Sequence, residues 1–326
     1  MWDKGLVIGK FYPPHAGHSY LIAAAGEQVE TLTVLLCRKA GESPEADLRA
    51  MWLQELHPKA QIRIIEDIGE DDNSALWADY TIRFLGYAPD VVFTSEDYGR
   101  PYAYYLGCDH VLVDRERRHM PCAGREIRKA PLENWSFLSP PVRAYYALRI
   151  AIIGAESTGT TTLAKDLAHE LRTAWVPEYG RLYSEAKLDT RESEVWRTEE
   201  FVHIAQMQNQ MEDELARTAD KVLLCDTTAF ATAVWHERYL GFRSSAVEVL
   251  SEGRHYGLHL LTGDEIPFVQ DGLRDGELIR HWMHDRFRAE LNSRGLRYLL
   301  VQGNRRERLA VAKKAIMDVL ETRETH

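Results

Sequence analysis

The chain has 326 residues, more than one compact domain usually holds, so its length predicts two domains. Hydrophobic residues make up 45% and charged residues 28%, which excludes a disordered or collagen-like chain. The net charge of -10 and the pI of about 5.7 disfavour a general nucleic-acid binder, so a site for polyanions would be a local pocket.

Short apolar runs alternate with longer amphipathic stretches in the first part of the chain, which predicts a parallel α/β sheet. The predicted strands cover residues 6–8, 32–36, 62–65, 91–93 and 111–113. The alternation then restarts, with predicted strands at 149–153, 222–225, 258–261 and 298–301 and helices such as 161–171 and 199–217 between them. The predicted fold class is therefore α/β with two domains.

A proline pair lies between the two series of strands. Pro140 and Pro141 interrupt the continuation of a helix, so they mark the connection between the domains. We place the boundary near residue 146, which predicts domains at 1–146 and 147–326. Each domain opens with a strand, a glycine-bearing turn and a helix, and the helix N-terminus of such a unit is a preformed phosphate site. The sequence therefore predicts two nucleotide sites.

The first glycine-bearing turn carries two histidines. It covers residues 9–18, with the sequence GKFYPPHAGH. Gly9 and Gly17 let the backbone approach a polyphosphate, while His15 and His18 donate hydrogen bonds to charge that develops at a reacting phosphorus. A loop with two solvent-facing histidines and an H-x-x-H metal pair are the alternatives, which the order of strand, turn and helix disfavours.

This segment resembles the G-x-F-x-P-x-H-x-G-H signature of the nucleotidylyltransferase superfamily. The matching positions are Gly9, Phe11, Pro13, His15, Gly17 and His18. Residues 93–99, 113–115 and 125–128 further resemble the nicotinamide mononucleotide adenylyltransferase domain of NadR-type bifunctional proteins. The resemblance implies a Rossmann-like domain in which a substrate phosphate attacks the α-phosphorus of ATP, with Mg2+ on the phosphates and pyrophosphate as the leaving group.

The resemblance also implies roles for individual residues of the first domain. The catalytic residues would be His15, His18 and Arg128. The ATP-binding residues would be Gly9, Lys10, Phe11, His15, His18, Ser95, Glu96, Tyr98, Arg125 and Arg128. Trp77 lies where similar proteins stack an aromatic ring on nicotinamide mononucleotide, although an ordinary core tryptophan is an equally good interpretation.

One motif departs from that family. Its second phosphate motif usually reads I-S-G-T-x-I-R, whereas residues 122–128 of this chain read CAGREIR. The hydroxyl pair is lost, because Ala123 offers no donor, while Arg125 adds a cation and Arg128 keeps the expected one. The departure leaves open whether activity is reduced or rebuilt around Arg125.

The second glycine-bearing turn has the G-x-x-x-x-G spacing of a P-loop at Gly154 and Gly159. Where that motif continues with Lys and then Ser or Thr, this chain has Thr160 and Thr161. The backbone cradle and a Mg2+-binding hydroxyl on Thr161 survive, but the cation for the β- and γ-phosphates does not. A phosphate-binding fold that no longer transfers phosphate is therefore the alternative to a kinase.

Arginines further along the chain are the candidates for the missing cation. Arg274 and Arg280 belong to a stretch, residues 271–280, that we expect to close over the phosphates as a lid. The predicted ATP-binding residues of this domain are Gly154, Glu156, Ser157, Thr158, Gly159, Thr160, Thr161, Thr162, Arg274 and Arg280.

Two other segments complete the predicted second site. An apolar strand ends at Asp226, the position from which a P-loop enzyme reaches Mg2+, so Thr161 and Asp226 are metal candidates and Asp226 is also a catalytic candidate as a base. Residues 175–181, WVPEYGR, bring aromatic rings, a carboxylate and a guanidinium together. Aromatic rings can stack on a cationic pyridinium, and the charged side chains can form hydrogen bonds with ribose hydroxyls. The predicted riboside-binding residues are Trp175, Glu178, Tyr179 and Arg181.

The order of these motifs resembles the ribosylnicotinamide kinase domain of the same NadR-type proteins, and so implies a P-loop kinase domain. Thr228 departs from that family, which often has an acidic residue there. The resemblance implies a bifunctional NAD salvage enzyme: the second domain phosphorylates nicotinamide riboside with ATP, and the first converts the resulting mononucleotide and another ATP to NAD. An enzyme with one working half and a module that senses NAD or ATP without turnover stay open as rivals.

The remaining expectations concern location and partners. The chain starts at the adenylyltransferase motif, so we expect no N-terminal helix-turn-helix domain and no transcriptional repression. Four cysteines without a C-x-x-C pair are typical of a reducing compartment, and no stretch approaches the roughly 20 apolar residues of a membrane span. We therefore predict a cytoplasmic protein with small-molecule partners and neither nucleic acid nor membrane as partner. A homo-oligomer stays open.

Overall fold

The computed structural model describes residues 1–70, 72–188, 195–270 and 277–324, and the chain separates into two compact units. The units are Met1–Val142 and Arg143–His326, so the division lies just before the predicted boundary near residue 146. The proline pair acts differently from the prediction, because Pro140 and Pro141 begin a helix, α6 (Pro140–Tyr146), instead of interrupting one. Proline is favoured in the first helical turn, where its missing N–H has no helical partner to lose.

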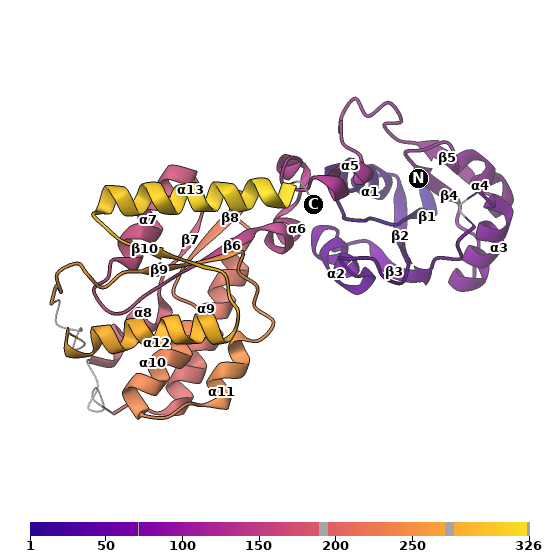
Figure 1. The fold of residues 1–326 in the computed structure, drawn as a ribbon. Helices are drawn as coiled ribbons and strands as arrows, with labels where there is room; N and C mark the ends of the chain where they lie inside the picture. Colours follow the sequence, from indigo (N-terminus) through magenta and orange to yellow (C-terminus); the bar gives the residue numbers. More distant parts are fainter. Residues whose placement is uncertain (71, 189–194, 271–276, 325–326) are drawn as a thin grey trace. The chain divides into compact units, whose positions relative to one another are not determined.

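The first unit is built on a parallel five-stranded sheet with the order β3-β2-β1-β4-β5 (Figure 1). Its strands are β1 (Trp2–Gly9), β2 (Val29–Arg38), β3 (Gln61–Glu66), β4 (Val91–Thr94) and β5 (Asp109–Leu112). Its helices are α1 (Ala16–Gly26), α2 (Ala46–Leu56), α3 (Ser74–Leu85), α4 (Gly99–Leu106) and α5 (Gly124–Lys129), followed by the 3-10 helix η1 (Trp135–Phe137). Every strand predicted for this half is present.

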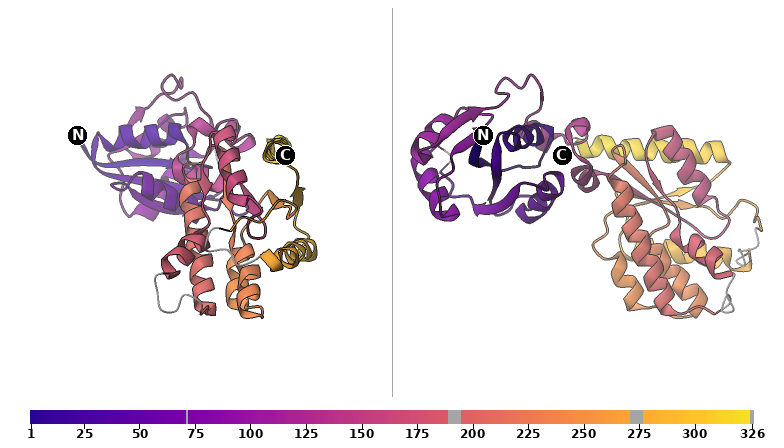
Figure 2. Two further views of the ribbon diagram at one scale, coloured as in Figure 1. Left: turned by 90° about the vertical axis from the view of Figure 1, so that its left-hand side faces the viewer. Right: turned by 180° about the vertical axis from the view of Figure 1, so that it is seen from behind.

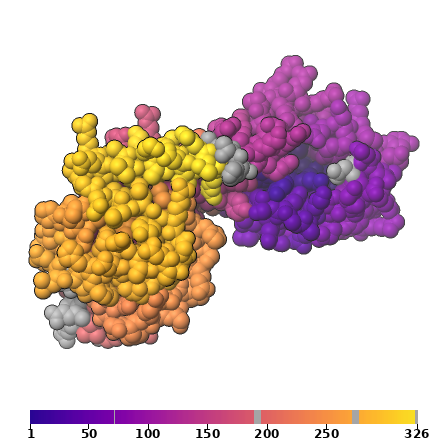
Figure 3. Space-filling model, in the orientation of Figure 1, coloured from indigo at the N-terminus to yellow at the C-terminus, as the bar shows by residue number. Residues whose placement is uncertain are grey.

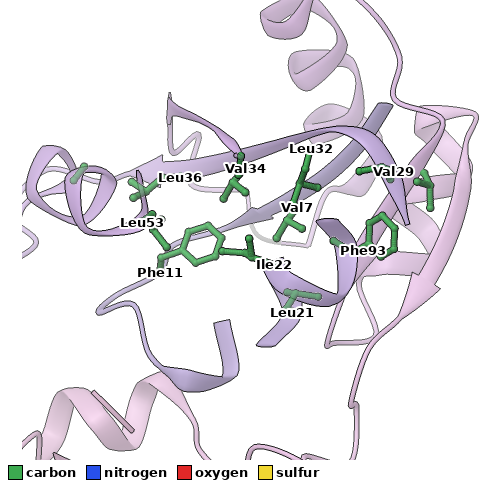
Figure 4. Close-up of a cluster of buried hydrophobic side chains, with 14 residues drawn as sticks. Val7, Phe11, Leu21, Ile22, Val29, Leu32, Val34, Leu36, Leu53 and Phe93 are labelled. Atoms are coloured by element: carbon green, nitrogen blue, oxygen red, sulfur yellow. The ribbon is translucent and has the colours of Figure 1, made fainter. Parts of the chain in front are cut away.

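Both faces of this sheet are covered by helices, which explains why its strands are apolar at successive positions. Val7 of β1 points into a cluster that includes Ile22 of α1 and Leu53 of α2 (Figure 4). Leu6 and Ile8 point the other way, into a cluster with residues of α3 and α4. The end of β1 is thereby held between two buried layers.

The second unit has a parallel sheet with the order β10-β9-β6-β8-β7. Its strands are β6 (Leu148–Ile153), β7 (Trp175–Val176), β8 (Val222–Asp226), β9 (Leu258–Thr262) and β10 (Tyr298–Val301). Its helices are α7 (Thr160–Leu171), α8 (Tyr179–Leu188), α9 (Thr198–Ala216), α10 (Ala229–Leu240), α11 (Ser245–Glu248), α12 (Arg280–Ser293) and α13 (Arg305–Glu324), with 3-10 turns η2 (Val249–Ser251) and η3 (Glu277–Ile279). Strand β7 is not among the predicted strands.

Helices also cover both faces of the second sheet. Helices α7 and α13 lie together on one face, and α10 and α12 lie on the other (Figures 1 and 2). Residues of α13 form one side of this unit in the space-filling view (Figure 3). Within the part of the chain that the structure describes, no helix has the length and apolar character needed to cross a membrane.

The strand orders predict where each sheet binds ligands. In the first unit β1 lies between β2 and β4, and in the second unit β6 lies between β8 and β9. At these points the chain changes the direction in which it adds strands, and ligands of open parallel sheets bind beyond the carboxyl ends of the strands there. The glycine-bearing turns after Gly9 and Ile153 occupy these positions.

Candidate active sites

His15 lies at the start of α1, where the loop that follows β1 ends. It is the N-cap residue of the helix, and its Nδ1 accepts a hydrogen bond from the backbone N–H of Gly17 at 3.1 Å. In the neutral imidazole the proton then lies on Nε2, which can donate it to a ligand. A Cβ added to Gly124 would lie 3.4 Å from Nε2, so this nitrogen faces the start of α5, where the second phosphate motif lies.

The two histidine rings of the first site lie against each other. His15 and His18 stack with centroids 3.6 Å apart and planes 28° apart, and Phe11 meets His18 edge-on. Burial lowers the pKa of His15 to about 4, and Arg117 and Arg128 add to the effect. Burial and the neighbouring His15 hold the pKa of His18 well below its ordinary value. Both rings are therefore neutral at pH 7, and Nδ1 of His18 is buried with no hydrogen-bond partner among the described residues.

The loop between β1 and α1 is held by two arginines from distant segments. Arg128 donates to the carbonyl oxygen of Tyr12 at 2.7 Å, and its guanidinium lies 5.0 Å from the centre of the Tyr12 ring. Arg49 of α2 is fully buried, donates to the carbonyl oxygen of Lys10, and pairs with Glu42 at 2.6 Å. The predicted catalytic residue Arg128 thus meets the histidine loop, whereas Arg49 escaped prediction because a single arginine in an amphipathic helix has no distinctive spacing.

Arg117 is a second residue that escaped prediction at this site. It lies in a loop held by Asp114, whose carboxylate accepts the backbone N–H groups of Arg118, His119 and Met120. The positive charge of Arg117 lowers the pKa of both His15 and His18, and its side chain pairs with the predicted residue Glu96 at 3.5 Å. A basic side chain therefore stands near the histidines in addition to Arg128.

Other predicted residues of the first site take up positions around β1. The hydroxyl of Tyr98 donates to the carbonyl oxygen of Ile8 at 3.0 Å, and desolvation of this hydroxyl raises its pKa although 39% of the side chain is exposed. Lys10 pairs with Asp67 at 3.2 Å. Phe11 is buried in the core cluster of Figure 4, so it supports the loop from below in addition to touching His18.

Three other predicted residues of the first site are Trp77, Arg125 and Ser95. Trp77 is half-buried in the first turns of α3, where its indole N–H donates to the carbonyl oxygen of Glu70 at 3.1 Å. Arg125 is exposed in α5, and Ser95 is half-buried after β4. Trp77 packs against the core, which fits both a packing role and a contact with the substrate, so its role stays a prediction.

In the second unit the P-loop runs from the end of β6 to the start of α7. A Cβ on Gly154 would lie 2.1 Å from Oγ1 of Thr262, so only glycine fits there. Gly159 is the N-cap of α7 and has a φ of 84°, which favours glycine. The hydroxyl of Thr158 donates to the carbonyl oxygen of Ala155 at 2.6 Å, which fixes the loop from inside. The predicted phosphate cradle is therefore a tightly packed turn.

The two predicted metal candidates contact each other directly. Oγ1 of Thr161 donates to Oδ2 of Asp226 at 2.5 Å. Asp226 is 1% exposed, and its Oδ1 has no hydrogen-bond partner among the described residues. Burial raises the pKa of Asp226 to about 6, although the hydroxyls of Thr161 and Thr160 act in the opposite direction.

The hydroxyl oxygen of Thr161 and the carboxylate oxygens of Asp226 are suitable ligands for Mg2+. This cation prefers hard oxygen ligands and is often held by one or two carboxylates together with substrate phosphates and water. The structure contains, among the residues it describes, no group of three His, Cys, Asp or Glu side chains that could hold a metal alone. Thr161 and Asp226 would therefore share Mg2+ with a nucleotide.

A cavity of about 170 Å3 joins the P-loop to the predicted riboside segment. Its lining from these two segments consists of Gly154, Ala155, Glu156, Ser157, Gly159, Thr160, Thr161, Thr162, Glu178, Gly180 and Arg181, and Ser184 of α8 follows them. Among the described residues, Trp175 and Tyr179 lie outside this lining. The ring of Trp175 faces the ammonium group of Lys165 at 5.2 Å, and the Tyr179 hydroxyl meets His203 at 3.1 Å.

Four aromatic residues that escaped prediction form another part of the cavity lining. They are Trp196, Phe201, Trp235 and Tyr239. The Trp196 ring lies 5.1 Å from the rings of both Phe201 and Tyr239, measured between centroids. Their signal was available in the sequence, since Trp235 and Tyr239 are four residues apart on α10 and so share a helix face, but that spacing is also typical of core residues.

The arginines predicted to serve the phosphates have different outcomes. Arg280 is buried at the start of α12 and donates to the carbonyl oxygens of Asp264 and Ile266 at 3.2 and 2.9 Å. Arg274 lies outside the described residues. Thr228, the departure from the expected acidic residue, is fully buried and caps α10, where its hydroxyl accepts the N–H of Ala231.

Two other arginines contact the P-loop itself. Arg238 of α10 pairs with Glu156 at 2.6 Å, and both side chains are almost completely buried. Arg308 of α13 donates to the carbonyl oxygen of Thr158 at 2.6 Å and to Glu265 at 2.7 Å. Both arginines come from helices far along the chain from the P-loop, so the P-loop motif did not predict their contacts.

Comparison with known proteins places the chain among similar sequences. A family profile described as an AAA domain matches residues 149–308. The trifunctional NAD biosynthesis/regulator protein NadR of Escherichia coli K12 is 30% identical over 292 residues, which cover 83% of this chain and 71% of that protein. The protein of the same name from Salmonella typhimurium LT2 has the same identity and coverage.

Solved structures give the same two-unit fold. A NadR protein in complex with NR has a TM-score of 0.80 at 19% identity, and one in complex with NAD and AMP-PNP has a TM-score of 0.76 at 18% identity. Each match covers 98% of this chain and 97% of the solved chain. At these identities the likeness shows a shared fold.

Proposed function

The chain belongs to the NadR family, and from this premise we propose that it is a bifunctional enzyme of NAD salvage that uses ATP in both units. The second unit would phosphorylate nicotinamide riboside to nicotinamide mononucleotide. The first would adenylylate the mononucleotide to NAD and release pyrophosphate. The observation that carries the proposal is the cavity in which the P-loop meets Glu178 and Arg181, because it offers one space to a phosphate donor and an acceptor.

In the first unit, an oxygen of the mononucleotide phosphate bonds to the α-phosphorus of ATP while the bond from that phosphorus to the α,β-bridging oxygen breaks. The tautomer of His15, set by Gly17, presents Nε2–H as a donor to the phosphate oxygens. Since both histidines are neutral at pH 7, other groups would supply positive charge, and Arg117 and Arg128 are near enough to act on His15. Arg125, exposed in α5, is the third candidate.

In the second unit, the 5′-hydroxyl oxygen of the riboside bonds to the γ-phosphorus, the bond to the β,γ-bridging oxygen breaks, and ADP leaves. Bound Mg2+ would neutralise phosphate charge, and Thr161 with Asp226 fits as its holder. The backbone of the P-loop cradles the phosphates. Glu178, which lines the cavity, would accept the hydroxyl proton, and the neighbouring aromatic residues would enclose the nicotinamide ring.

The test is chromatography with mass detection of products formed from nicotinamide riboside, ATP and Mg2+, with a parallel sample that starts from the mononucleotide. We expect NAD from both. Asp226→Asn is expected to stop formation of the mononucleotide and to leave its conversion to NAD unchanged, whereas His15→Ala is expected to do the reverse. Each variant therefore serves as the control for the other.

The two rival functions predict different product patterns. NAD formed from the mononucleotide but not from the riboside would restrict the chemistry to the first unit. The mononucleotide as the final product would restrict it to the second. Absence of product in both samples, together with tight Mg2+-dependent binding of ATP, would favour a sensing module without turnover.

A further inference from the structure

The P-loop of this chain lacks the lysine that normally binds the β- and γ-phosphates, because Thr160 occupies its position. Phosphoryl transfer depends strongly on positive charge around the transferred group, so another cation should occupy that role if the second unit is a kinase. The positive side chains around the P-loop can be compared by the contacts that already hold them.

Arg308 is held too firmly to move toward a nucleotide. Its guanidinium donates to the carbonyl oxygens of Gly303, Thr158 and Gly263, and it pairs with Glu265. The side chain is buried, so these acceptors would be left without their donor if it turned away. Arg308 therefore supports the P-loop from outside the cavity.

Arg238 and Arg280 are held in other ways. Arg238 pairs with Glu156 at 2.6 Å, and its guanidinium lies 4.7 Å from the centre of the Tyr239 ring. Breaking a buried pair of this kind is costly, because it leaves an uncompensated charge. Arg280 donates to the carbonyl oxygens of Asp264 and Ile266, which directs its guanidinium to the segment after β9.

Arg181 differs from these arginines in its position. Among the described residues that line the cavity it is the single lysine or arginine, and it shares that lining with Thr160 and Thr161. It pairs with Glu185, one turn along α8, at 3.0 Å, and the two side chains are 39% and 47% exposed. Arg181 therefore places a positive charge in the same cavity as the hydroxyls of the P-loop.

We propose that Arg181 supplies the phosphate-binding cation that the P-loop of this chain lacks, a role that rests on the proposed kinase function. A guanidinium binds two phosphate oxygens at once, so it can bridge the β- and γ-phosphates that a lysine would otherwise contact. This role differs from the sequence-based interpretation of Arg181 as a ribose contact.

The two roles of Arg181 predict different kinetics for Arg181→Gln. In the phosphate role, the inhibition constant of AMP-PNP against the kinase reaction rises about 10- to 100-fold, that of adenosine stays unchanged, and the KM for the riboside changes little. In the ribose role, the KM for the riboside rises and the inhibition constant of AMP-PNP stays unchanged, which would overturn the proposal. Arg305→Gln, which removes an exposed guanidinium paired with Asp166, is the matched control.

A second variant tests whether Arg181 and the missing lysine do the same work. Thr160→Lys combined with Arg181→Gln is expected to recover most of the lost kinase rate, because lysine restores a cation at the phosphates. If the double variant is no faster than Arg181→Gln alone, the two positions are not equivalent and the proposal fails. A selective loss of AMP-PNP affinity in Arg274→Gln, with Arg181→Gln unaffected, would assign the role to Arg274 instead.

A binding measurement separates this proposal from the proposed function. Calorimetric titration with Mg-AMP-PNP, with NAD present to occupy the first unit, reads the phosphate contact without turnover. If the riboside is not phosphorylated but Arg181→Gln still weakens AMP-PNP binding about tenfold or more, the kinase function fails and the role of Arg181 stands. If the affinity is unchanged, the role of Arg181 is wrong whatever the substrate.

Discussion

The backbone N–H of Gly17 donates to Nδ1 of His15, and the α-carbon of the same glycine leaves little room beside the imidazole ring. A Cβ at Gly17 would lie 3.0 Å from Cε1 of His15 and 3.3 Å from Sγ of Cys122. The imidazole of His15 is therefore packed against the same glycine whose backbone N–H sets its tautomer. Small displacements of a positioned catalytic group have large effects on rate.

Gly17→Ala is expected to separate activity from stability. The added methyl group displaces the His15 ring, so conversion of the mononucleotide to NAD falls about tenfold or more. The melting temperature does not fall, because alanine favours the helical conformation of α1 over glycine by roughly 1 kcal/mol. Rates and thermal unfolding of the same preparation test this. Gly26→Ala, whose Cβ would meet only Leu32 at 3.9 Å, is the control and should keep full activity.

The lowered pKa of His15 predicts how stability depends on pH. The folded chain holds this proton less tightly than the unfolded chain, whose histidine titrates near 6.5, so the contribution of His15 is complete above pH 6.5 and is lost as pH falls toward 4. Between pH 6.5 and 5 the loss is about 1.5 kcal/mol. The free energies of unfolding of the wild type and of His15→Gln, measured with urea, should therefore differ by that much less at pH 5 than at pH 6.5. Parallel stability curves would contradict the assignment of a low pKa.

Removal of the Arg308 guanidinium is expected to destabilise the second unit. Arg308→Met leaves the buried carbonyl oxygens of Thr158 and Gly263 without this donor and removes the pair with the partly exposed Glu265, which costs about 2 kcal/mol or more. Arg308→Lys keeps the charge but has fewer donors in a different geometry, so its stability should lie between those of the wild type and Arg308→Met. Thermal unfolding measures the effect, and Arg305→Met, which removes an exposed guanidinium, should change stability far less. Equal losses in both methionine variants would contradict the argument.

The aromatic part of the cavity lining predicts a substrate effect. Trp196→Ala removes a ring that lines the cavity and contacts Phe201 and Tyr239, so the KM for the riboside should rise about tenfold while the KM for ATP changes little. Trp196→Phe should recover most of the affinity. Trp282, an exposed tryptophan of α12, gives the control variant Trp282→Ala. An increase in the KM for ATP instead would show that this ring faces the nucleotide.

The sequence predicted the sheets well, because short apolar runs that alternate with amphipathic helical stretches are a strong signal. Strand β7 was missed because Trp175 and Val176 are too few to show any periodicity. The proline pair was misinterpreted because proline has two opposite effects on helices, and its position decides between them: Pro140 and Pro141 stand at the start of α6, where proline is tolerated.

The residues of the candidate sites could also be predicted only in part. Residues within one turn, such as His15 and His18 or Gly154 and Thr161, could be predicted because neighbouring positions in a strand, turn and helix unit have fixed relations. Arg49 and Arg308 could not, because each reaches its loop from a helix whose own pattern does not indicate the destination. Long-range side-chain contacts depend on packing, and no local spacing encodes them.

The hydrogen bond from Arg308 to Thr158 joins residues that are 150 positions apart. During synthesis the chain emerges from its N-terminus, and domains fold as units in that order. Residues 1–142, which carry both histidines and Arg128, can all leave the ribosome while the P-loop still lacks the arginine that holds it. The histidine site of the first unit can therefore be assembled on the nascent chain well before the P-loop site, which has to wait until residue 308 has been added.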